Sequence, residues 1–514
     1  MLPAAAAQLP AAPSPGSAAP HPLHELPRML STFEQLGPQM KNYMLFQLLR
    51  RCAHPSLQFL NGIIAPTLKR DFLRLLPFEL CQQVLQNLDA RSLARCAIVS
   101  KGWRAVVEGR GAEITVWKRR LVERGWLHDD EVSLYRRHHI IQQNWNKGRC
   151  ERTSFPGHGS HVVTCLQFDA DKIVSGSDDQ SIHIYSTKGH LLQRLTGHDG
   201  GVWALQYWRH ILVSGSTDRS VRVWDMDRGV NTHTFEGHTS TVRCLMILIP
   251  RPHCETGVLE PPEPLIVTGS RDTTLRVWRL PDPHTDPGWD AAAHAGEDRV
   301  NPWFKHVLAG HEQSVRAIAG KGRILVSGSY DHTVRIWDVM EGRVNWVCSG
   351  HTQKVYSVGY CEETARAVSG SMDMSVRVWC TKTGTALFNL EGHSNLVGLL
   401  ELSPHYLVTA AADWTLRIWN PMNGQCLARL KGHTAAITCF HHDPALNRIV
   451  SGSEGGVKDA RVLAGADGAP VYGRPIGDIV SNAVGVWRVR MDEERLVCAV
   501  QKELEQTFFE VLDF

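Results

Sequence analysis

Three arginines of this sequence could together bind a doubly charged anion. Arg243 and Arg316 each follow the valine of a Gly-His-x-x-x-Val segment, and Arg271 directly precedes the aspartate of a Thr-Gly-Ser-x-Asp segment. Guanidinium groups gathered in one place repel one another unless an anion lies between them. A phosphate carries a charge of about −1.5 to −2 and accepts the paired hydrogen bonds of an arginine. If the segments converge in space, we expect a phosphate site; if they do not, each arginine is a solvated surface residue.

The segments that hold these arginines recur along the chain. Gly-His pairs are separated by 40, 40, 73, 40, 42 and 40 residues, and a period near 40 is typical of a stacked repeat. The pairs begin at Gly157, Gly197, Gly237, Gly310, Gly350, Gly392 and Gly432. Six residues after the aspartate of the second segment comes an aromatic: Tyr185, Trp224, Trp278, Trp337, Trp379 and Trp419. Alternating side chains before each aromatic predict short strands.

The conserved types within each unit predict a buried polar network. A histidine, a Ser or Thr hydroxyl, an aspartate and an indole N–H can satisfy one another and hold a tight turn against a sheet. We therefore interpret these histidines and aspartates as structural and not as catalytic dyads.

This repeat resembles the WD repeat, which implies a β-propeller. Seven clear units and one weaker terminal unit predict eight blades, and the segment before Gly157 is expected to supply the strand that closes the ring. Two insertions, near 249–263 and 281–302, are expected in surface loops. The segment 454–483 departs from the pattern, because Gly455 replaces the aspartate and no Trp follows at the usual distance.

In a propeller of this kind, two positions of each unit face the mouth of the central channel. The residue after the motif Val or Ile is Thr164, Trp203, Arg243, Arg316, Tyr356, Gly398 or Thr438. The residue before the turn aspartate, or its counterpart in the last unit, is Asp178, Thr217, Arg271, Tyr330, Met372, Ala412 or Glu454. The three arginines thus fall in neighbouring units. Tyr330 could add a hydroxyl donor, and Trp203, Tyr356 and Met372 could form apolar walls or simply pack between blades.

The region before the repeats predicts helices. Residues 1–28 are rich in Ala and Pro and are expected to be a disordered tail. Apolar residues at helical spacing over 29–68 predict a helical segment that either packs on the next domain or self-associates. Residues 113–150 are expected to form a charged helical linker to the propeller at 151–514.

Residues 69–112 predict a small helical module of a recognisable type. The order of Leu76, Pro77, Leu80 and Val84, followed by Val-Ser-Lys-Gly-Trp at 99–103, resembles the F-box. The resemblance implies that these four residues bind the adaptor subunit that links an F-box to a cullin scaffold. The alternative is that they are core residues of a helical bundle.

An F-box followed by eight WD units resembles the cell-division-control protein 4 family of SCF substrate receptors. The resemblance implies that Arg243, Arg271, Arg316 and Tyr330 hold a central phosphate of a phosphorylated Ser/Thr-Pro degron. It further implies roles for flanking residues: Trp203, Thr217 and Thr241 would receive the following Pro, Tyr356 and Met372 the preceding apolar residues, and Arg219 with Ser240 a second acidic group. The segment before the F-box, residues 29–66, would form a homodimer.

The resemblance leads to a functional prediction. The chain is expected to be a non-catalytic adaptor of a cullin–RING ubiquitin ligase that promotes ubiquitination and proteasomal degradation of cell-cycle regulators. The main alternative is a WD-repeat scaffold without ligase function. A ligase with its own catalytic cysteine lacks support, because no cysteine stands in a recognisable nucleophile setting.

Composition excludes other classes. Lys and Arg number 55 against 52 Asp and Glu, a net charge of +3, so no nucleic-acid-sized basic surface is expected. The 13 cysteines show no CxxC and no Cys/His cluster at zinc spacing, and no metal or cofactor is predicted from them. No apolar run reaches membrane-spanning length. The nucleus is the expected location, with the cytoplasm as an alternative.

Overall fold

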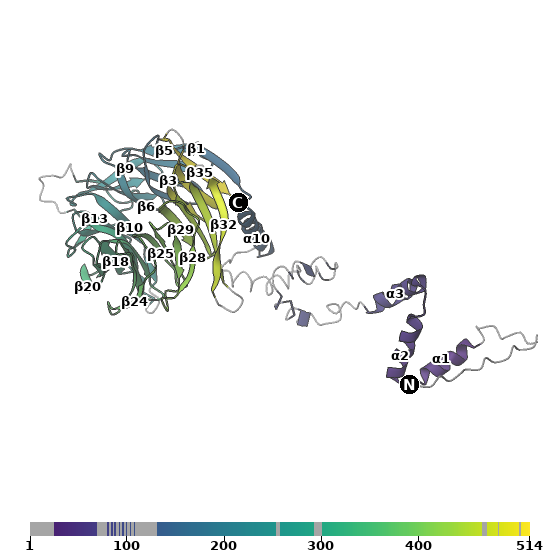
Figure 1. Cartoon of the computed structure of the whole chain (residues 1–514). Coiled ribbons are helices and arrows are strands. Elements are labelled where there is room, and N and C mark those ends of the chain that lie inside the picture. Colours follow the sequence, from purple (N-terminus) through teal and green to yellow (C-terminus); the bar gives the residue numbers. More distant parts are fainter. Residues whose placement is uncertain are drawn as a thin grey trace, which may run out of the picture. The chain divides into compact units, whose positions relative to one another are not determined.

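A computed structural model describes the chain in several ranges. These are residues 25–68, separate residues between 80 and 107, and 131–252, 257–291, 301–464, 470–481, 483–502 and 505–514. Two compact units divide the chain, residues 1–120 and 121–514. The second unit carries the repeats and is shown with its strand labels in Figure 1.

The described repeats form eight blades, each built on four antiparallel strands in the order expected for a propeller, and the sheet of one blade carries an additional strand. Blade 1 consists of β2 (Val163–Phe168), β3 (Lys172–Ser177), β4 (Ile182–Ser186) and β5 (Leu191–Leu195), and blade 2 of β6 (Val202–Trp208), β7 (Ile211–Ser216), β8 (Val221–Asp225) and β9 (Val230–Phe235). Blade 3 consists of β10 (Val242–Leu248), β13 (Leu265–Ser270), β14 (Leu275–Arg279) and β16 (Phe304–Leu308), and blade 4 of β17 (Val315–Lys321), β18 (Ile324–Ser329), β19 (Val334–Asp338) and β20 (Arg343–Cys348).

The last four blades complete the ring. Blade 5 consists of β21 (Val355–Cys361), β22 (Arg366–Ser371), β23 (Val376–Cys380) and β24 (Ala386–Leu390), and blade 6 of β25 (Val397–Leu402), β26 (Leu407–Ala411), β27 (Leu416–Trp419) and β28 (Cys426–Leu430). Blade 7 consists of β29 (Ile437–Asp443), β30 (Arg448–Ser453), β31 (Gly456–Ala464) and β32 (Pro470–Ser481), and blade 8 of β33 (Gly485–Met491), β34 (Arg495–Gln501), β35 (Thr507–Asp513) and β1 (Glu151–Pro156). The prediction of eight blades is therefore confirmed.

The first and last strands of the propeller close the ring by pairing with each other. β1 lies antiparallel to β35, with Glu151 opposite Asp513 and Phe155 opposite Phe509. Closure removes the open sheet edge that a partial ring would expose. The strand expected before Gly157 is thus present.

A shared polar network lies at one end of the blades. In the described blades 1 to 6 the motif histidine donates from Nδ1 to the turn aspartate at 2.7 to 3.0 Å, and its Nε2 pairs with a Ser or Thr hydroxyl at 2.7 to 2.9 Å. In blade 2 the same hydroxyl, Ser214, also accepts from Trp224 Nε1 at 2.8 Å. This is the network that the sequence predicts.

Burial and hydrogen bonding act in opposite directions on the network aspartates. Burial alone would raise the pKa of Asp218, but hydrogen bonds from His198 and Ser220 together with the His198 charge hold it well below its usual value. Blade 7 lacks the aspartate: His433 pairs instead with Ser451 and Ser453 at 2.7 and 2.6 Å. Burial, aided by the charge of Lys458, lowers the pKa of His433 to about 4.

The described parts of the two insertions of blade 3 lie largely at the surface, as predicted, but both contain short strands that the sequence did not predict. The first forms a short hairpin of β11 (Arg251–Pro252) and β12 (Leu259–Glu260). The second crosses to blade 2, where β15 (Trp289–Asp290) pairs in parallel with β9 and adds a fifth strand. Leu280 and Trp303, at the ends of this insertion, are buried in a core cluster with residues of blade 2. Burial of these apolar anchors explains why the segment packs on the sheet.

Helix α10 (Glu131–Lys147) ends where β1 begins and packs on the propeller (Figure 1). The Trp145 ring stacks on Phe514 at 3.6 Å between centroids, and Trp145 Nε1 donates to the Glu493 carbonyl at 2.8 Å. Cys150 and Ile141 lie in the same core cluster as blade 8. The predicted helical linker is therefore, at its described end, an ordered part of the propeller unit.

Three helices stand where the sequence predicts one helical segment. They are α1 (Leu26–Glu34), α2 (Pro38–Leu49) and α3 (His54–Leu68). α2 begins after Gly37 with Pro38 at its first position, where a missing N–H is tolerated. α1 begins at Leu26, inside the predicted tail, and the rest of that tail lies outside the described residues. No described helix is both long and apolar enough to span a membrane.

The blade network leads to a stability prediction. Ser214→Ala should lower the free energy of unfolding by about 1–3 kcal/mol, because it leaves His198 Nε2 and Trp224 Nε1 buried without their shared partner. Denaturant titration of the full chain measures this. Ser394→Ala, at an exposed position after another Gly-His pair, is the matched control and should change stability little; equal effects of the two variants would contradict the role of the network.

Candidate functional site

One β-bulge in the inner strand of each blade positions the channel-mouth side chains. The register shifts by one residue directly after the first pair of each inner strand, so that one side chain is left out of the ladder. The bulged residues are Thr164, Trp203, Arg243, Arg316, Tyr356, Gly398, Thr438 and Trp487. The predicted channel-mouth positions after the motif Val or Ile thus coincide with the bulges.

A backbone hydrogen bond places the second set of predicted residues beside the first. The N–H of Arg271 donates to the Thr241 carbonyl at 3.0 Å, and the N–H of Tyr330 donates to the Ser314 carbonyl at 3.0 Å. The same bond joins Thr217 to Gly201 at 3.0 Å. Each blade therefore presents its bulged residue and the residue before its turn aspartate at the same end of the sheet.

Arg243 lies at the centre of the candidate site. Its guanidinium carbon is 4.3 Å from the centroid of the Trp203 ring in the preceding blade, a cation–π contact. Burial lowers the pKa of Arg243, and the positive charges of Arg316 and Arg271 lower it further. The structure thus brings the three predicted arginines within electrostatic reach of one another across blades 3 and 4.

Two tyrosines extend the site toward blade 5. The rings of Tyr330 and Tyr356 are 5.4 Å apart, and the Arg316 guanidinium carbon is 5.9 Å from the Tyr356 centroid. Burial and a hydrogen bond with Tyr330 raise the pKa of Tyr356, and the charges of Arg316 and Arg243 oppose this. The Tyr356 hydroxyl therefore remains a protonated donor near neutral pH.

The arginines of this site lack carboxylate partners among the described residues. No ion pair within 4.0 Å joins Arg243, Arg271 or Arg316 to an acidic side chain in that part of the chain, whereas some arginines elsewhere on the propeller, such as Arg323 with Asp338, are paired. Arg316 Nε is buried and has no hydrogen-bond partner there, but the same is true of Nε in Arg222, Arg276, Arg335, Arg377 and Arg417. What distinguishes the site is that three positive charges lie together without an acidic partner, and this arrangement favours an anionic ligand.

The other predicted residues line the rim of the same surface. Thr217, Met372 and Arg219 are exposed, while Ser240 and Thr241 are partly buried. The Thr241 and Ser240 carbonyls accept hydrogen bonds from Arg271 N and Ser270 Oγ, both at 3.0 Å. Among the described residues, no hydrogen bond joins Arg219 to Ser240, so a combined role of these two stays a prediction.

Sequence reasoning missed two residues of this surface. Lys354 Nζ is 4.8 Å from the Tyr330 ring centroid and adds a fourth positive charge. It stands one residue before Val355, at the position that Thr241 has in blade 3. A comparison of the residues before the motif valine in each unit would therefore have predicted it. Trp487, the bulged residue of blade 8, was missed because its unit lacks a Gly-His pair.

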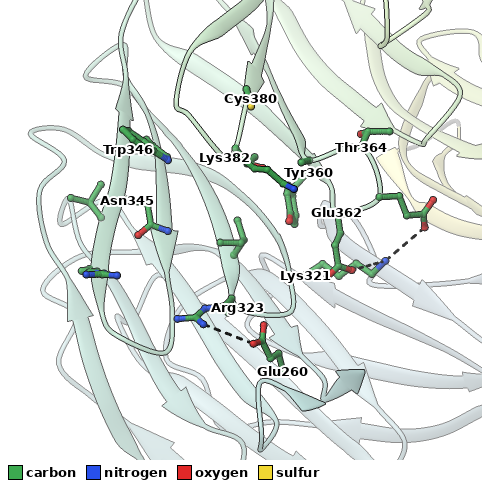
Figure 2. Close-up of a pocket in the computed structure, with 16 residues that line it drawn as sticks. Glu260, Lys321, Arg323, Asn345, Trp346, Tyr360, Glu362, Thr364, Cys380 and Lys382 are labelled. Carbon is green, nitrogen blue, oxygen red and sulfur yellow. Dashed lines mark ion pairs between the residues drawn. The ribbon is translucent and has the colours of Figure 1, made fainter. Parts of the chain in front are cut away.

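A large groove lies elsewhere on the propeller. It has a volume of about 950 Å³ and lies between blades 4 and 5, lined by Trp346, Tyr360 and charged residues (Figure 2). Its charges are compensated: Lys321 pairs with Glu362 at 3.1 Å, and Arg323 lies 3.9 Å from Glu260. Because its cations already have partners, this groove does not compete with the arginine site for a phosphate.

Part of the predicted adaptor-binding surface is described. Leu80 and Val84, one helical turn apart, expose 45% and 42% of their surface, whereas Cys81 and Leu85 on the adjacent face are buried. Exposed apolar side chains on one helix face are typical of a binding surface. Leu76 and Pro77 lie outside the described residues.

Comparison with known proteins agrees with both halves of the chain. The F-box-like family matches residues 73–121, and the WD domain, G-beta repeat, family matches seven segments between 148 and 458. Cell division control protein 4 of Candida albicans is 41% identical, over 96% of this chain and 75% of that protein. The chain belongs to the cell division control protein 4 family. This family consists of F-box/WD-repeat substrate receptors of SCF ubiquitin ligases.

Further relatives cover most of the chain. WD repeat-containing protein pop2 of Schizosaccharomyces pombe is 40% identical over 95% of this chain and 72% of that protein, and cell division control protein 4 of Saccharomyces cerevisiae is 36% identical over 92% and 64%. Among solved structures, the computationally designed Ika8 protein is similar, with a TM-score of 0.56, 27% identity, and coverage of 70% of this chain and 99% of that one. As an F-box/WD-repeat protein of this family, the chain is a substrate adaptor that binds the SCF adaptor subunit through its F-box.

The unpaired arginines generate a prediction about stability. Arg271→Gln should raise the free energy of unfolding by about 0.2–1 kcal/mol in low-salt buffer without phosphate, because it removes an exposed charge that repels Arg243. Thermal melts with and without inorganic phosphate measure this. Phosphate should stabilise the wild type more than the variant; a lower melting temperature for Arg271→Gln without phosphate would mean that Arg271 has a structural partner.

Proposed function

We propose that the propeller binds phosphorylated Ser/Thr-Pro degrons, and that the F-box brings the bound protein to a cullin–RING ubiquitin ligase. The chain would thereby promote ubiquitination and proteasomal degradation of cell-cycle regulators. The observation that carries the proposal is the cluster of three arginines without carboxylate partners, centred on Arg243 and walled by Trp203 and Tyr356. A phosphate would supply the missing negative charge, and the aromatic rings suit the Pro and apolar residues beside it.

The proposed chemistry is proximity, with no step at a residue of this chain. Holding a substrate near the ubiquitin-loaded enzyme raises its effective concentration, which accelerates transfer without a nucleophile from the receptor. Two neighbouring aromatic–arginine contacts, Trp203 with Arg243 and Tyr356 with Arg316, would pre-orient the guanidinium groups. Pre-orientation lowers the entropy lost on binding.

Self-association through residues 29–66 and action in the nucleus are parts of the same proposal. Apolar side chains on α1 and α2, among them Met29, Tyr43 and Phe46, are more than half exposed. A second copy could cover this surface, and pairing two receptors would raise the avidity for weakly binding degrons.

Peptide binding tests the degron proposal. A fluorescent Leu-Leu-pThr-Pro peptide should bind the full chain, and its unphosphorylated form should bind at least about 100-fold more weakly, since two or more charge-assisted hydrogen bonds are lost. Arg243→Ala and Arg271→Ala should each weaken binding at least about 10-fold, as measured by fluorescence anisotropy. Arg343→Ala, which removes an exposed arginine paired with Glu341, is the control. Equal affinity for the two peptides would overturn the proposal.

Capture of the ligase tests the receptor role against a scaffold without ligase function. The full chain should co-purify with the SCF adaptor subunit and cullin, and Leu80→Asp with Val84→Asp should abolish this by placing charge on the exposed apolar face. Leu192→Asp, a matched change at an exposed apolar position of β5, should leave capture intact. Phosphopeptide binding by the F-box variant should persist. Absence of capture by the wild type would favour the scaffold, and capture that survives both F-box changes would show that Leu80 and Val84 do not carry adaptor binding.

A further inference from the structure

Asp178 places a negative charge at the channel mouth on the blade 1 side of the arginine site. Its N–H donates to the Val162 carbonyl at 3.2 Å, the same bond that positions Arg271 and Tyr330 in blades 3 and 4. The Asp178 side chain is 40% exposed. Of the channel-mouth positions predicted from the sequence, two carry a carboxylate, Asp178 in blade 1 and Glu454 in blade 7. The mouth is therefore positive over blades 3 to 5 and negative at blades 1 and 7.

Two glycines of blade 2 lie between Asp178 and Thr217. The Gly201 carbonyl accepts from Thr217 N at 3.0 Å, and a Cβ at position 201 would lie 3.0 Å from Asp178 Cα. A Cβ on Gly200 would overlap the Thr217 hydroxyl. Asp178 and Thr217 thus contact the same short backbone segment from two sides, and they do so because this segment has no side chains.

The missing side chain at Gly201 is particular to blade 2. In the other six Gly-His units, the residue before the motif Val or Ile is Val, Thr, Ser, Lys, Leu or Ala. Trp203, two residues after Gly201, stacks on Arg243 of blade 3. From blade 3 to blade 1, the order across the mouth is therefore Arg243, then Trp203 with Thr217, and then Asp178.

One carboxylate oxygen of Asp178 is available to a ligand. Oδ1 accepts from Val162 N at 2.8 Å and from Ser177 Oγ at 3.3 Å, and His161 Nδ1 lies 3.5 Å from this same oxygen. In the described part of the chain, no hydrogen bond reaches Oδ2. A carboxylate accepts hydrogen bonds at both oxygens, so the contacts of Oδ1 orient the side chain and leave Oδ2 for a cation.

We propose that Asp178 selects substrates that carry a Lys or Arg one to three residues after the phosphorylated Ser/Thr-Pro pair. This inference rests on the proposed function. With the phosphate on the arginines and the Pro against Trp203 and Thr217, the substrate leaves the site toward blade 1. An extended chain advances about 3.3–3.6 Å per residue, so a long cationic side chain soon after the Pro comes within reach of Asp178 Oδ2.

Two other exposed charges act on the same part of the substrate. Arg219, two residues after Thr217, repels a cation there, and Asp199, in the loop before Gly200, attracts one. Among the residues that the structure describes, no ion pair within 4.0 Å joins Arg219 to Asp178. Exposed charges are screened over about 10 Å at 0.1 M salt, so neither residue replaces a direct contact with Asp178. Arg219→Gln should accordingly strengthen the preference for a cation or leave it unchanged.

Peptide binding to the full chain tests the proposal. The probes are Leu-Leu-pThr-Pro followed by Lys-Gly-Gly, Gly-Lys-Gly or Gly-Gly-Lys, each matched by a peptide with Gln in place of Lys. In fluorescence anisotropy at low salt, the wild type should bind at least one Lys peptide about 2- to 5-fold more tightly than its Gln counterpart, the range of an exposed ion pair. This preference should decrease as the salt concentration rises.

Three variants locate the contact. Asp178→Asn keeps an oxygen acceptor for Val162 N and removes the charge, so it should abolish the preference for Lys and bind the Gln peptides like the wild type. Asp178→Lys should reverse the preference. Glu454→Gln removes the other carboxylate of the channel mouth and is the matched control; it should keep the preference for Lys.

Equal binding of the Lys and Gln peptides by the wild type would overturn the proposal. A preference that persists in Asp178→Asn, or that is lost equally in Glu454→Gln, would overturn it as well. These results would leave the proposed function intact, because the Gln peptides still report phosphate-dependent binding. If no phosphopeptide binds, the Gln peptides included, the proposed function itself is wrong and the role of Asp178 with it.

Discussion

The hydrogen bond from the motif histidine to the turn aspartate is the interaction on which the binding surface depends. In blade 2, Asp218 accepts from His198 Nδ1 through one oxygen at 2.7 Å and from Ser220 N through the other at 2.8 Å. It thereby joins the loop before the inner strand to the turn between the second and third strands. The bulged residue directly follows this loop, and Thr217 directly precedes Asp218 in the turn. The network therefore sets the distance between the bulged residue and Thr217, whatever their side chains are. The blades can therefore share one scaffold and differ at the mouth of the channel.

Local patterns predict the ring well and its irregularities poorly. The 40-residue spacing and the Asp-to-Trp distance determine strand order and the channel-facing register, because each depends on residues of a single unit. Closure pairs β1 with β35 and is expected because an open sheet edge is unfavourable. The side of blade 2 on which β15 lies depends instead on burial of Trp303 and Leu280 in a neighbouring blade, which no local pattern records. Lys354 belongs to a third position that converges on the channel mouth, the residue before the motif valine, which the two predicted registers do not include. Gly37 and Pro38 divide the predicted helical segment, because Pro38 starts a new helix after the extended Gly37.

The arginine site holds positive charges that the described residues do not compensate. Arg243 is half buried beside two like charges, which lower its pKa, and Arg316 Nε is buried without a partner in the described part of the chain. A carboxylate side chain in place of Gly398 or Ala412, the equivalent positions of blade 6, would reduce the repulsion among the arginines. No steric clash with such a side chain is evident. Both positions instead carry residues without charge. The net charge of +3 therefore conceals an excess of positive charge that is local to blades 3, 4 and 5.

Blades 2 and 3 are linked at two places. At the channel mouth Arg243 of blade 3 stacks on Trp203 of blade 2, and at the outer edge of blade 2 the blade 3 insertion pairs with β9. A shift between these blades would change the position of Arg243 and of Arg271 relative to the Trp203 ring. Because close-packed interiors transmit strain, the pairing at the outer edge restrains the geometry at the mouth without touching the arginine site. The insertion thus bears on that site through the relative placement of two blades.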